Sequence, residues 1–474
     1  MAGRRPAHPA RLVPAGLAAL AVLAVAAAGG CTSVMPPEEP PPATTSPSFA
    51  AFDPPARFDL DAAVRLKAVD ETYQGTLDGF IYYTLDSNAV IWGVDVRSGD
   101  AVLSASLPGY DTGPIDAWRC WQQVVDEARV YTIAANQQGD PQAPAPLELT
   151  AVDKASGEIA WRYTVPTTQP PLATECGATL DFSLTMTTAG LLVVFSERAA
   201  AEPPEDGENS GAAFTSQSVM LDPASGTVIW QASFAVQATG QAAYGIAVQN
   251  AGATDEPGTD GTGGTGAAPP APAQLVAVQL ATGQPGPPIV VDQPGDATRP
   301  VSYQLAGQSG DNLVVLQQQT PATTGDTASS EAADMTTTIL QVVAASGQLS
   351  DDSPVNMNDS DLINCQLASD ALLVCTKASD QTTAAAVTIA DGKTHWQHAF
   401  TGQPGITPLL FHGYLYGTNQ PGSQAFVLDT SSGQIIQTGV YPQPIAVNPN
   451  GLIFSVNDGP QGPGWQCWWA PALG

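Results

Sequence analysis

Along most of the chain after residue 60, short apolar stretches alternate with polar turns. The segment AVDKASGEIAW, residues 151–161, shows the pattern, with two runs of strand-forming residues on either side of a turn that contains Gly157. β-Branched and aromatic residues are favoured in strands, and a glycine beside aspartate and serine is typical of a tight turn with positive φ. The segment therefore predicts a β-hairpin, which needs partners to bury its apolar face.

The same turn occurs seven times, at intervals of 41 to 69 residues. Ahead of each turn lies further predicted strand sequence, such as VSYQLAGQSGDNLVVLQQQ at 301–319. Two hairpins per repeat make a four-stranded antiparallel sheet, and repeated sheets of this kind bury their faces by stacking radially. We therefore expect an all-β chain that folds as a β-propeller of four-stranded antiparallel blades. The turn glycines are Gly99, Gly157, Gly226, Gly283, Gly347, Gly392 and Gly433.

The number of blades depends on how the ring closes. An eighth predicted pair of strands, YPQPIAVNPNGLIFSVND, follows the seventh turn and leads to GWQCWWAPA near the end of the chain. No eighth turn follows. PARFDLDAAVRL, near residues 56–66, could supply the missing strand from the other end of the chain. Eight blades is therefore the first interpretation, and seven is the alternative.

Two of the turns resemble a known repeat. Their matching residues are Asp153, Ser156, Gly157 and Trp161 in one copy and Asp222, Ser225, Gly226 and Trp230 in the other. They resemble the signature A-x-D-x-x-T/S-G-x-x-x-W of pyrroloquinoline-quinone-like (PQQ-like) propeller repeats. Trp396 follows Asp391 and Gly392 with one residue fewer, while the other four copies have lost the tryptophan. The resemblance covers most of residues 60–460 and implies that Trp161, Trp230 and Trp396 dock against neighbouring blades.

The start of the chain has the composition of an export signal. Three arginines precede an apolar run from Leu12 to Gly30, which ends in small residues before Cys31. This order is that of a secretory signal. Ala28-Gly29-Gly30-Cys31 resembles a bacterial lipobox, although Ala28 stands where leucine is usual. We therefore predict a lipoprotein signal peptide over 1–30 and lipidation of Cys31, with an ordinary cleaved signal or an uncleaved anchor as alternatives.

The segment after Cys31 is rich in proline, serine and threonine and poor in aliphatic residues. Such a composition cannot bury enough apolar surface to fold, so residues 31–56 are predicted to be a tether, with the propeller over 57–474. A lipid and a tether predict an extracytoplasmic protein that is anchored to the cell membrane.

Charge narrows the range of partners. Without Arg4, Arg5 and Arg11 the chain has 15 − 3 = 12 Lys plus Arg against 45 Asp plus Glu, a formal balance of 12 − 45 = −33. Such a field repels nucleic acid, so none is expected as a partner. The composition, rich in Ala, Gly and Pro and poor in Lys, is typical of a high-GC actinobacterium.

Five cysteines remain if Cys31 carries a lipid. Cys365 and Cys375 flank a predicted hairpin with Asp370 in its turn, so a cross-strand disulfide is geometrically plausible. Cys120 and Cys176 precede strand pairs at similar positions of two repeats, and a bridge between them is a second hypothesis. The fifth cysteine is Cys467, and the connectivity stays open.

Four insertions lengthen the predicted blades two to five, each between the second and third strands, where they would lie on one face of a propeller. They form either a recognition rim or tolerated loop growth, and their Gly, Thr, Ala and Pro content favours the second. The insertions lie near residues 136–146, 197–213, 250–273 and 320–335.

Catalytic chemistry is hard to find in the sequence. The segment 261–266 matches G-x-G-x-x-G, but no strand precedes it and a proline-rich stretch follows. His395 and His398 are three apart on a predicted strand and are expected on opposite faces, so they should not chelate one metal together. The chain has no Cys-Cys pair and no residues that match the calcium ligands of PQQ-dependent dehydrogenases. We therefore expect no cofactor, no metal and no catalytic residues.

Three functional hypotheses follow. The first is a lipid-anchored, non-catalytic propeller, monomeric, that acts as a scaffold or binding protein for envelope or secreted proteins. The second is a binder of small molecules or carbohydrates in the central funnel. The third, a degenerate PQQ-dependent dehydrogenase, has the least support.

Overall fold

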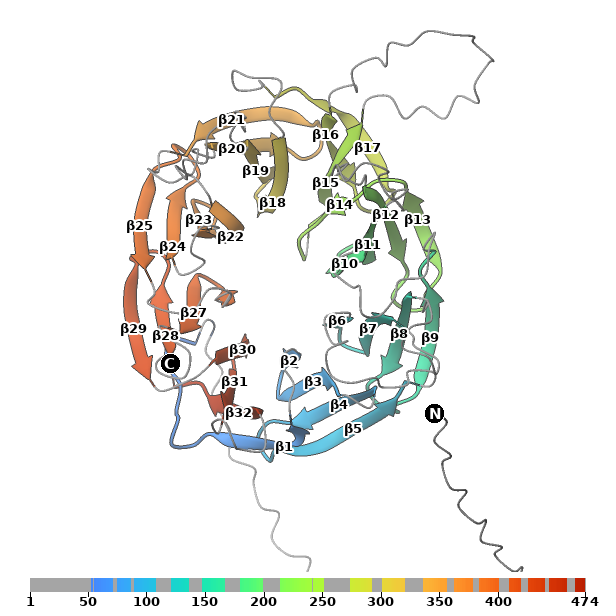
Figure 1. The fold of residues 1–474 in the computed structure, drawn as a ribbon, viewed down its shortest axis with the longest axis vertical. Helices are drawn as coiled ribbons and strands as arrows, with labels where there is room; N and C mark the ends of the chain where they lie inside the picture. The colour runs from blue at the N-terminus through green and yellow to red at the C-terminus, as the bar shows by residue number, and fades with distance from the viewer. Residues whose placement is uncertain are drawn as a thin grey trace, which may run out of the picture. The chain divides into compact units, whose positions relative to one another are not determined.

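In the computed structural model, the described residues form 32 strands arranged in eight four-stranded antiparallel sheets. Figure 1 shows these sheets around a ring, which is the architecture of an eight-bladed β-propeller. Eight blades, rather than seven, is therefore the correct number. The described residues are 53, 55–70, 75–86, 89–107, 121–135, 147–166, 180–198, 214–240, 242–250, 273–291, 301–319, 336–355, 362–377, 383–399, 409–418, 425–439, 443–457 and 465–473.

The first four blades each consist of strands that follow one another in the sequence. Blade 1 contains β2 (Thr76–Asp78), β3 (Ile81–Leu85), β4 (Val90–Asp95) and β5 (Asp100–Ser106). Blade 2 contains β6 (Trp121–Val125), β7 (Arg129–Ala135), β8 (Leu147–Asp153) and β9 (Ile159–Thr164). Blade 3 contains β10 (Leu180–Thr187), β11 (Gly190–Arg198), β12 (Phe214–Leu221) and β13 (Val228–Ala232). Blade 4 contains β14 (Val236–Gln237), β15 (Tyr244–Asn250), β16 (Ala273–Gln279) and β17 (Gln284–Ile289).

The next three blades follow the same order, and the last one joins the two ends of the chain. Blade 5 contains β18 (Val301–Ser309), β19 (Asn312–Gln319), β20 (Thr336–Val343) and β21 (Gln348–Pro354). Blade 6 contains β22 (Leu362–Ser369), β23 (Leu372–Lys377), β24 (Thr383–Thr388) and β25 (Thr394–Ala399). Blade 7 contains β26 (Leu409–Phe411), β27 (Tyr414–Thr418), β28 (Ala425–Asp429) and β29 (Gln434–Gly439). Blade 8 contains β30 (Gln443–Asn448), β31 (Gly451–Asn457), β32 (Trp465–Pro471) and β1 (Val64–Asp70).

The seven predicted turn glycines all join the third and fourth strands of a blade, with φ between 63° and 73°. In each turn the glycine N–H donates to the carbonyl four residues earlier, at 2.8–2.9 Å. A register shift follows in every pairing between third and fourth strand. This combination is the hairpin in which a left-handed residue creates a bulge, and glycine adopts that conformation without steric cost.

Apolar side chains form eight clusters, one between each pair of adjacent blades. Between blades 2 and 3, for example, Tyr131 and Leu149 of one sheet pack with Val193 and Phe195 of the other. A blade therefore buries both of its faces, and the core is distributed around the ring rather than placed at a centre.

The N-terminal segment closes the ring. β1 pairs antiparallel with β32 as the outer strand of blade 8, and Phe58 forms an isolated bridge with Ala472. The closing strand begins later than the predicted 56–66, because Asp59 accepts from the amides of Asp61 and Ala62 and so fixes a turn before β1.

The two faces of the ring carry different connections, because successive turns of an antiparallel sheet alternate between its two ends. We call the face with the turns from first to second and from third to fourth strand the turn face. The loop face carries the links from second to third strand and from blade to blade. The four predicted insertions lie between second and third strands. Residues 136–146, 199–213, 251–272 and 320–335 are outside the described residues, whereas the remaining predicted positions belong to the ends of β11, β15 and β16. Within the described part of the chain, no helix is long and apolar enough to cross a membrane.

The buried closing residue Phe58 gives a test of ring closure. Its side chain is only 2% exposed and packs edge-on against Tyr416 of blade 7, with ring centroids 5.9 Å apart. Because the change deletes a buried aromatic ring, Phe58→Ala should lower the free energy of unfolding by about 3–5 kcal/mol. Urea denaturation followed by tryptophan fluorescence measures this. Asp61→Ala, at an exposed position of the same segment, should change it by less than about 0.5 kcal/mol, and similar losses in both variants would contradict the closure.

Candidate functional site

The three repeat tryptophans lie on outer strands and contact the next blade. The indole Nε1 of Trp161 donates to the Pro223 carbonyl at 3.0 Å, and that of Trp230 to the Leu280 carbonyl at 2.6 Å. Trp396 donates in the same way to the Thr430 carbonyl, at 2.6 Å. In all three cases the acceptor lies at the start of the neighbouring blade's glycine turn. The indole therefore joins two blades through both its ring and its N–H.

The turn glycine of the next blade lies directly against each indole. A Cβ placed on Gly226 would come within 2.6 Å of the Trp161 ring, and one on Gly283 within 2.5 Å of the Trp230 ring. These glycines therefore meet two demands, a positive φ and close approach of an aromatic ring.

Backbone replaces the indole where the tryptophan is missing. A Cβ on Gly347 would approach the carbonyl of Pro287, and one on Gly157 the carbonyl of Ser104. In the two remaining turns, Gly99 lies against the Arg65 carbonyl and Gly392 against the Pro354 carbonyl. An outer strand therefore contacts the next turn in all seven cases, tightly in six and at an ordinary van der Waals distance at Gly157, and the tryptophan is one way of making this contact.

A polar network reinforces the contact between blades 2 and 3. The Pro223 carbonyl also accepts from Arg129, at 2.8 Å, and lies 3.1 Å from the Tyr131 hydroxyl. The same hydroxyl donates to the Asp126 carboxylate at 2.6 Å. Burial, with the Asp126 hydrogen bond, raises the pKa of Tyr131 well above its usual range, so this phenol stays protonated. Near neutral pH the Tyr131 hydroxyl therefore acts as a hydrogen-bond donor that links β7 to the Asp126 turn.

Two glutamines on innermost strands form clamps that the sequence did not suggest. Gln122 of β6 donates to the Phe182 carbonyl at 2.9 Å and accepts from the Leu184 amide at 2.9 Å, both on β10 of the next blade. Gln237 of β14 binds the backbone of β18 in the same way. Each side-chain amide thus bonds one carbonyl and one N–H at the inner edge of the next blade, as the backbone of a further strand would. A lone glutamine on a short strand gives no sequence signal for this role.

The histidines require a correction. His395 and His398 were expected on opposite faces of their strand. In the structure both contact one turn of blade 7, His395 at the Ser431 carbonyl (2.7 Å) and His398 at the Gly433 carbonyl (3.1 Å). The register of β25 against β24 shifts at this point, and the extra residue breaks the strict alternation of side chains.

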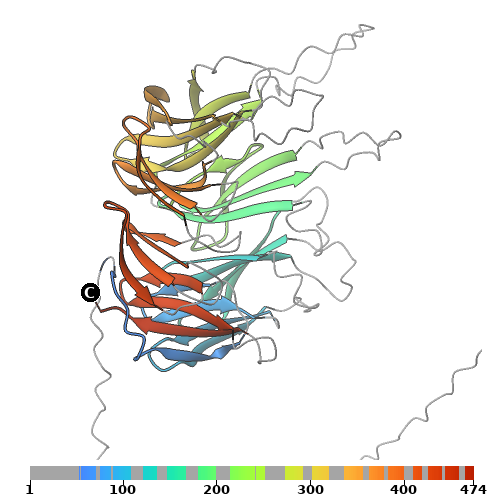
Figure 2. The same cartoon turned by 60° about the vertical axis from the view of Figure 1, so that its left-hand side comes forward.

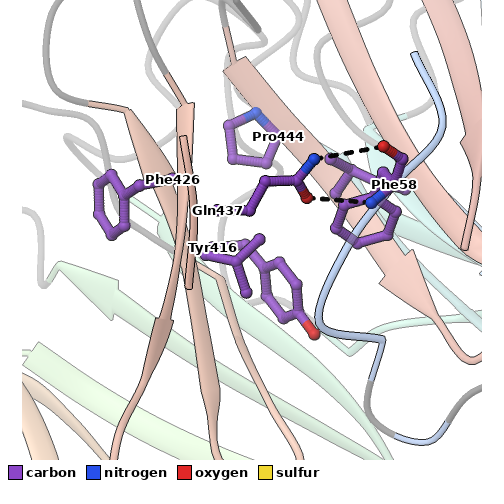
Figure 3. A pocket seen from close by; sticks show the side chains of 7 residues that line it. Phe58, Tyr416, Phe426, Gln437 and Pro444 are labelled. Carbon is purple, nitrogen blue, oxygen red and sulfur yellow. Dashed lines mark hydrogen bonds between the residues drawn. The ribbon is translucent and has the colours of Figure 1, made fainter. Parts of the chain in front are cut away.

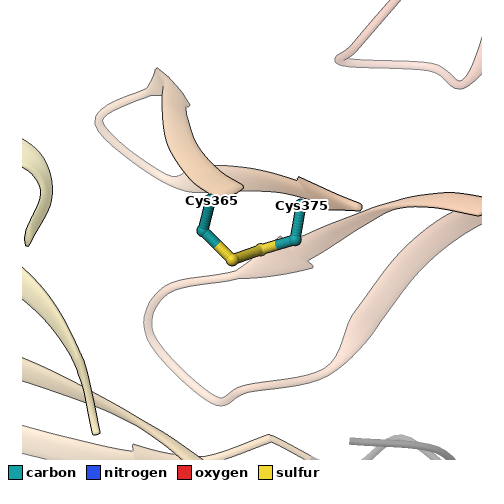
Figure 4. The surroundings of a disulfide bond; sticks show 2 residues. All are labelled: Cys365 and Cys375. Atoms are coloured by element: carbon teal, nitrogen blue, oxygen red, sulfur yellow. A yellow bond between two sulfur atoms is a disulfide. The ribbon is translucent and has the colours of Figure 1, made fainter. Parts of the chain in front are cut away.

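A disulfide joins Cys365 and Cys375 across the hairpin of β22 and β23, and Figure 4 shows its place in blade 6. Both cysteines are 1% exposed and belong to the apolar cluster between blades 5 and 6. Cys467 is buried in β32. The predicted lipidation site Cys31 and the proposed bridge between Cys120 and Cys176 lie outside the described residues.

A small apolar pocket lies where the N-terminal segment meets blades 7 and 8. In Figure 3, Gln437 reaches across it to Phe58, whose backbone N–H and carbonyl it binds at 3.0 and 3.3 Å. The Tyr416 hydroxyl nearby donates to the Pro55 carbonyl at 2.8 Å. The remaining lining residues are Phe426, Val427, Pro444 and Leu452. These polar groups are engaged in fastening the chain, so the pocket is part of the ring closure.

Among the described residues, no group of three or more His, Cys, Asp or Glu side chains is placed to hold a metal ion. The polar contacts above join one blade to the next. The fold and these contacts together define the class of the protein as an eight-bladed β-propeller.

Comparison with solved structures finds several matches of low sequence identity. The chain is similar to BamB from Moraxella catarrhalis, with 13% identity, a TM-score of 0.44, and coverage of 86% of this chain and 99% of that one. It is also similar to the C-terminal WD40 domain of Sif2, with 9% identity, a TM-score of 0.48, and 90% and 100% coverage. A europium-containing methanol dehydrogenase matches with 8% identity, a TM-score of 0.45, and 88% and 94% coverage. No protein-family model and no curated protein sequence matches the chain. At these levels the similarities carry no argument about function.

The turn glycines allow backbone strain and steric contact to be separated. Gly310→Ala would place a methyl group in open space at φ 57°, so it should cost only the left-handed strain, about 1–2 kcal/mol. Gly226→Ala adds contact with the Trp161 ring, so its cost should be larger by a further 1–3 kcal/mol or so. Urea unfolding of the two variants measures the difference. Equal costs would show that the indole is not packed on this glycine.

The glutamine clamp can be tested by removing its amide. Gln122→Met keeps the length of the side chain but leaves the Phe182 carbonyl and Leu184 amide without these partners, which should cost about 1–3 kcal/mol. Gln366→Met, at an exposed position of the innermost strand β22, is the matched control and should be nearly neutral. Equal stability of both variants by urea unfolding would rule out the clamp.

The turn aspartates predict a loss of stability in acid. Hydrogen bonds to the Asp153 carboxylate hold its pKa below the ordinary value of 3.8. The bond from the Ser156 amide has the largest effect, and the bond from the Ser156 hydroxyl has the next largest. Since the folded-state pKa is the lower one, the carboxylate stabilises the fold above the unfolded-state pKa, and this contribution is lost as pH falls through the folded-state pKa. Urea midpoints measured from about pH 5 down to about pH 2 should therefore fall less steeply in Asp153→Asn than in the unaltered protein. An unchanged acid dependence would contradict the assignment.

Proposed function

We propose that the chain is a membrane-anchored extracytoplasmic lipoprotein whose propeller is a non-catalytic scaffold or binding module for envelope or secreted proteins. The observation that carries this proposal is that polar side chains of the described residues bind other parts of the propeller itself. Gln122, Trp161 and Lys154 each bind a neighbouring strand, turn or side chain of the propeller. Groups used in this way make a rigid support, and they are not arranged around a reacting centre.

The disulfide supports the extracytoplasmic assignment. Buried cross-strand cystines form and persist in oxidising compartments and are rare in the cytosol. The sequence before the propeller adds the predicted signal of residues 1–30, which ends before Cys31, and the predicted tether of residues 31–56. Export followed by lipid anchoring accounts for all three features.

The resemblance of the turns to PQQ-like repeats raises the question of a quinone cofactor with calcium. Calcium requires six to eight oxygen ligands, several of them carboxylates. In the described part of the chain, the innermost strands expose mainly neutral groups such as Ser183, Ser302 and Gln366, and no acidic cluster is present. The residues do not fit the cofactor, so we derive no step that uses it.

The neutral inner strands favour a second candidate function. Hydroxyl and carboxamide groups both donate and accept hydrogen bonds, as sugar hydroxyls require. Exposed Ser183, Ser302 and Gln366 lie on β10, β18 and β22, all innermost strands. A carbohydrate or another small polar molecule in the central funnel is therefore the alternative ligand. Thermal shift measurements with a panel of sugars test it, because a ligand that binds only the folded form raises the melting temperature.

Replacement of the acylated residue tests the proposed function. Cys31→Ala should move the protein from the membrane fraction to the soluble fraction, and intact-mass analysis of the unaltered protein should show acyl chains at Cys31. Chemical crosslinking on intact membranes should then join the unaltered protein to a defined envelope protein, and Cys31→Ala should lose that product. Membrane retention of Cys31→Ala, or a melting temperature raised by PQQ with calcium, would contradict the proposal.

A further inference from the structure

We propose that the anchored protein holds its turn face toward the bilayer and its loop face away from it. This inference rests on the proposed function, because it takes the lipid at Cys31 as the point of attachment. It adds which face of the ring is available to partners in the extracytoplasmic space.

The direction of the closing strand is the first argument. In blade 8 the fourth strand is β1, which runs antiparallel to β32. A fourth strand starts at the turn face and ends at the loop face, where the chain passes on to blade 1. The chain must therefore enter the propeller at the turn face. The other end of the chain lies there too, because the Leu473 amide donates to the Arg57 carbonyl at 2.8 Å. Figure 2 shows the C-terminal end beside this first, blue segment.

The way the entering segment is fastened is the second argument. Gln437 binds both backbone groups of Phe58, and the Tyr416 hydroxyl holds the Pro55 carbonyl. Nearer the N-terminus, Asp53 pairs with His412. This histidine lies in the turn between β26 and β27, on the turn face. The propeller thus holds the segment as far as Asp53, which stands 53 − 31 = 22 positions after Cys31. The connection to Cys31 therefore leaves the propeller from the turn face.

Hydrogen bonds between neighbouring turns on the turn face are the third argument. Neighbouring blades bind one another across it, as when Asn448 and Asn450 of blade 8 both donate to the Gly79 carbonyl of blade 1, at 2.8 and 3.1 Å. Ser309 of blade 5 similarly contacts the Asp370 carbonyl of blade 6, at 3.3 Å. Backbone groups of the turns are therefore engaged within the ring, which suits a face that is turned to the membrane.

Two labelling positions in blade 3 test the orientation. Ser225 is exposed in the turn before β13, and Ser233 is exposed just after it, so they mark the two faces at opposite ends of one strand. The five residues of β13 separate them by about 17 Å. Full-length, acylated Ser225→Cys and Ser233→Cys are labelled with a fluorescent donor and placed in liposomes that contain an acceptor lipid in the outer leaflet. The unaltered protein gives the background labelling of native cysteines.

The donor on Ser225→Cys should lose more emission to the acceptor lipid than the donor on Ser233→Cys. Equal losses, or a larger loss at Ser233→Cys, would overturn the orientation while leaving the anchor in place. Failure of the proposed function is a different result: the protein would carry no acyl chain by mass and would bind liposomes no better than Cys31→Ala. That outcome overturns the anchor and the orientation together.

Discussion

A four-stranded sheet with two apolar faces cannot cover either face by itself, and this constraint organises the whole molecule. The buried residues on one face of each blade pack against those of the next blade. The eight resulting clusters form a closed ring, because the last one joins blade 8 to blade 1. The arrangement is complete only if β1 joins β32, because blade 8 otherwise lacks its outer strand. Burial of Leu66 in the cluster that joins blade 8 to blade 1 shows how the N-terminal segment becomes part of the core.

Specific polar contacts then fix the position of each blade against the next. A tryptophan N–H reaches a turn carbonyl, and a glutamine amide pairs with a strand edge. Buried or half-buried groups of this kind stabilise one arrangement, because any slip between blades would leave them without partners. The same contacts show that these polar side chains are used to join one blade to the next within the described part of the ring. In the proposed function, the closing segment determines which face of the ring is available to a partner.

The sequence predicted the features whose causes are local. Gly226 and Asp222 form their turn through contacts within a few residues, so a short pattern identifies it. The fold class followed from the repetition of such turns. Cys365 and Cys375 could be paired because one hairpin contains both.

Features that depend on distant segments were less accessible. Gln122 acts on β10, some 60 residues away, and nothing near it in the sequence marks that role. His395 and His398 were misplaced because the bulge in β25 changes the alternation of side chains. The closing strand starts at Val64 instead of residue 56 because Asp59 stabilises a turn first. The resemblance of the turns to PQQ-like repeats implied that the three tryptophans dock against neighbouring blades. The carbonyls that accept from their indole N–H groups were identified only in the structure.

Hydrogen exchange, resolved by peptide and mass, tests the closure of the ring most directly. If β1 completes blade 8, those of its amides that face β32 should exchange as slowly as the corresponding amides of β9, the outer strand of blade 2, because both are protected by the same position in a closed blade. Fast exchange in β1 and β32, beside slow exchange in the other blades, would mean that the ring is open at this point and would contradict the account.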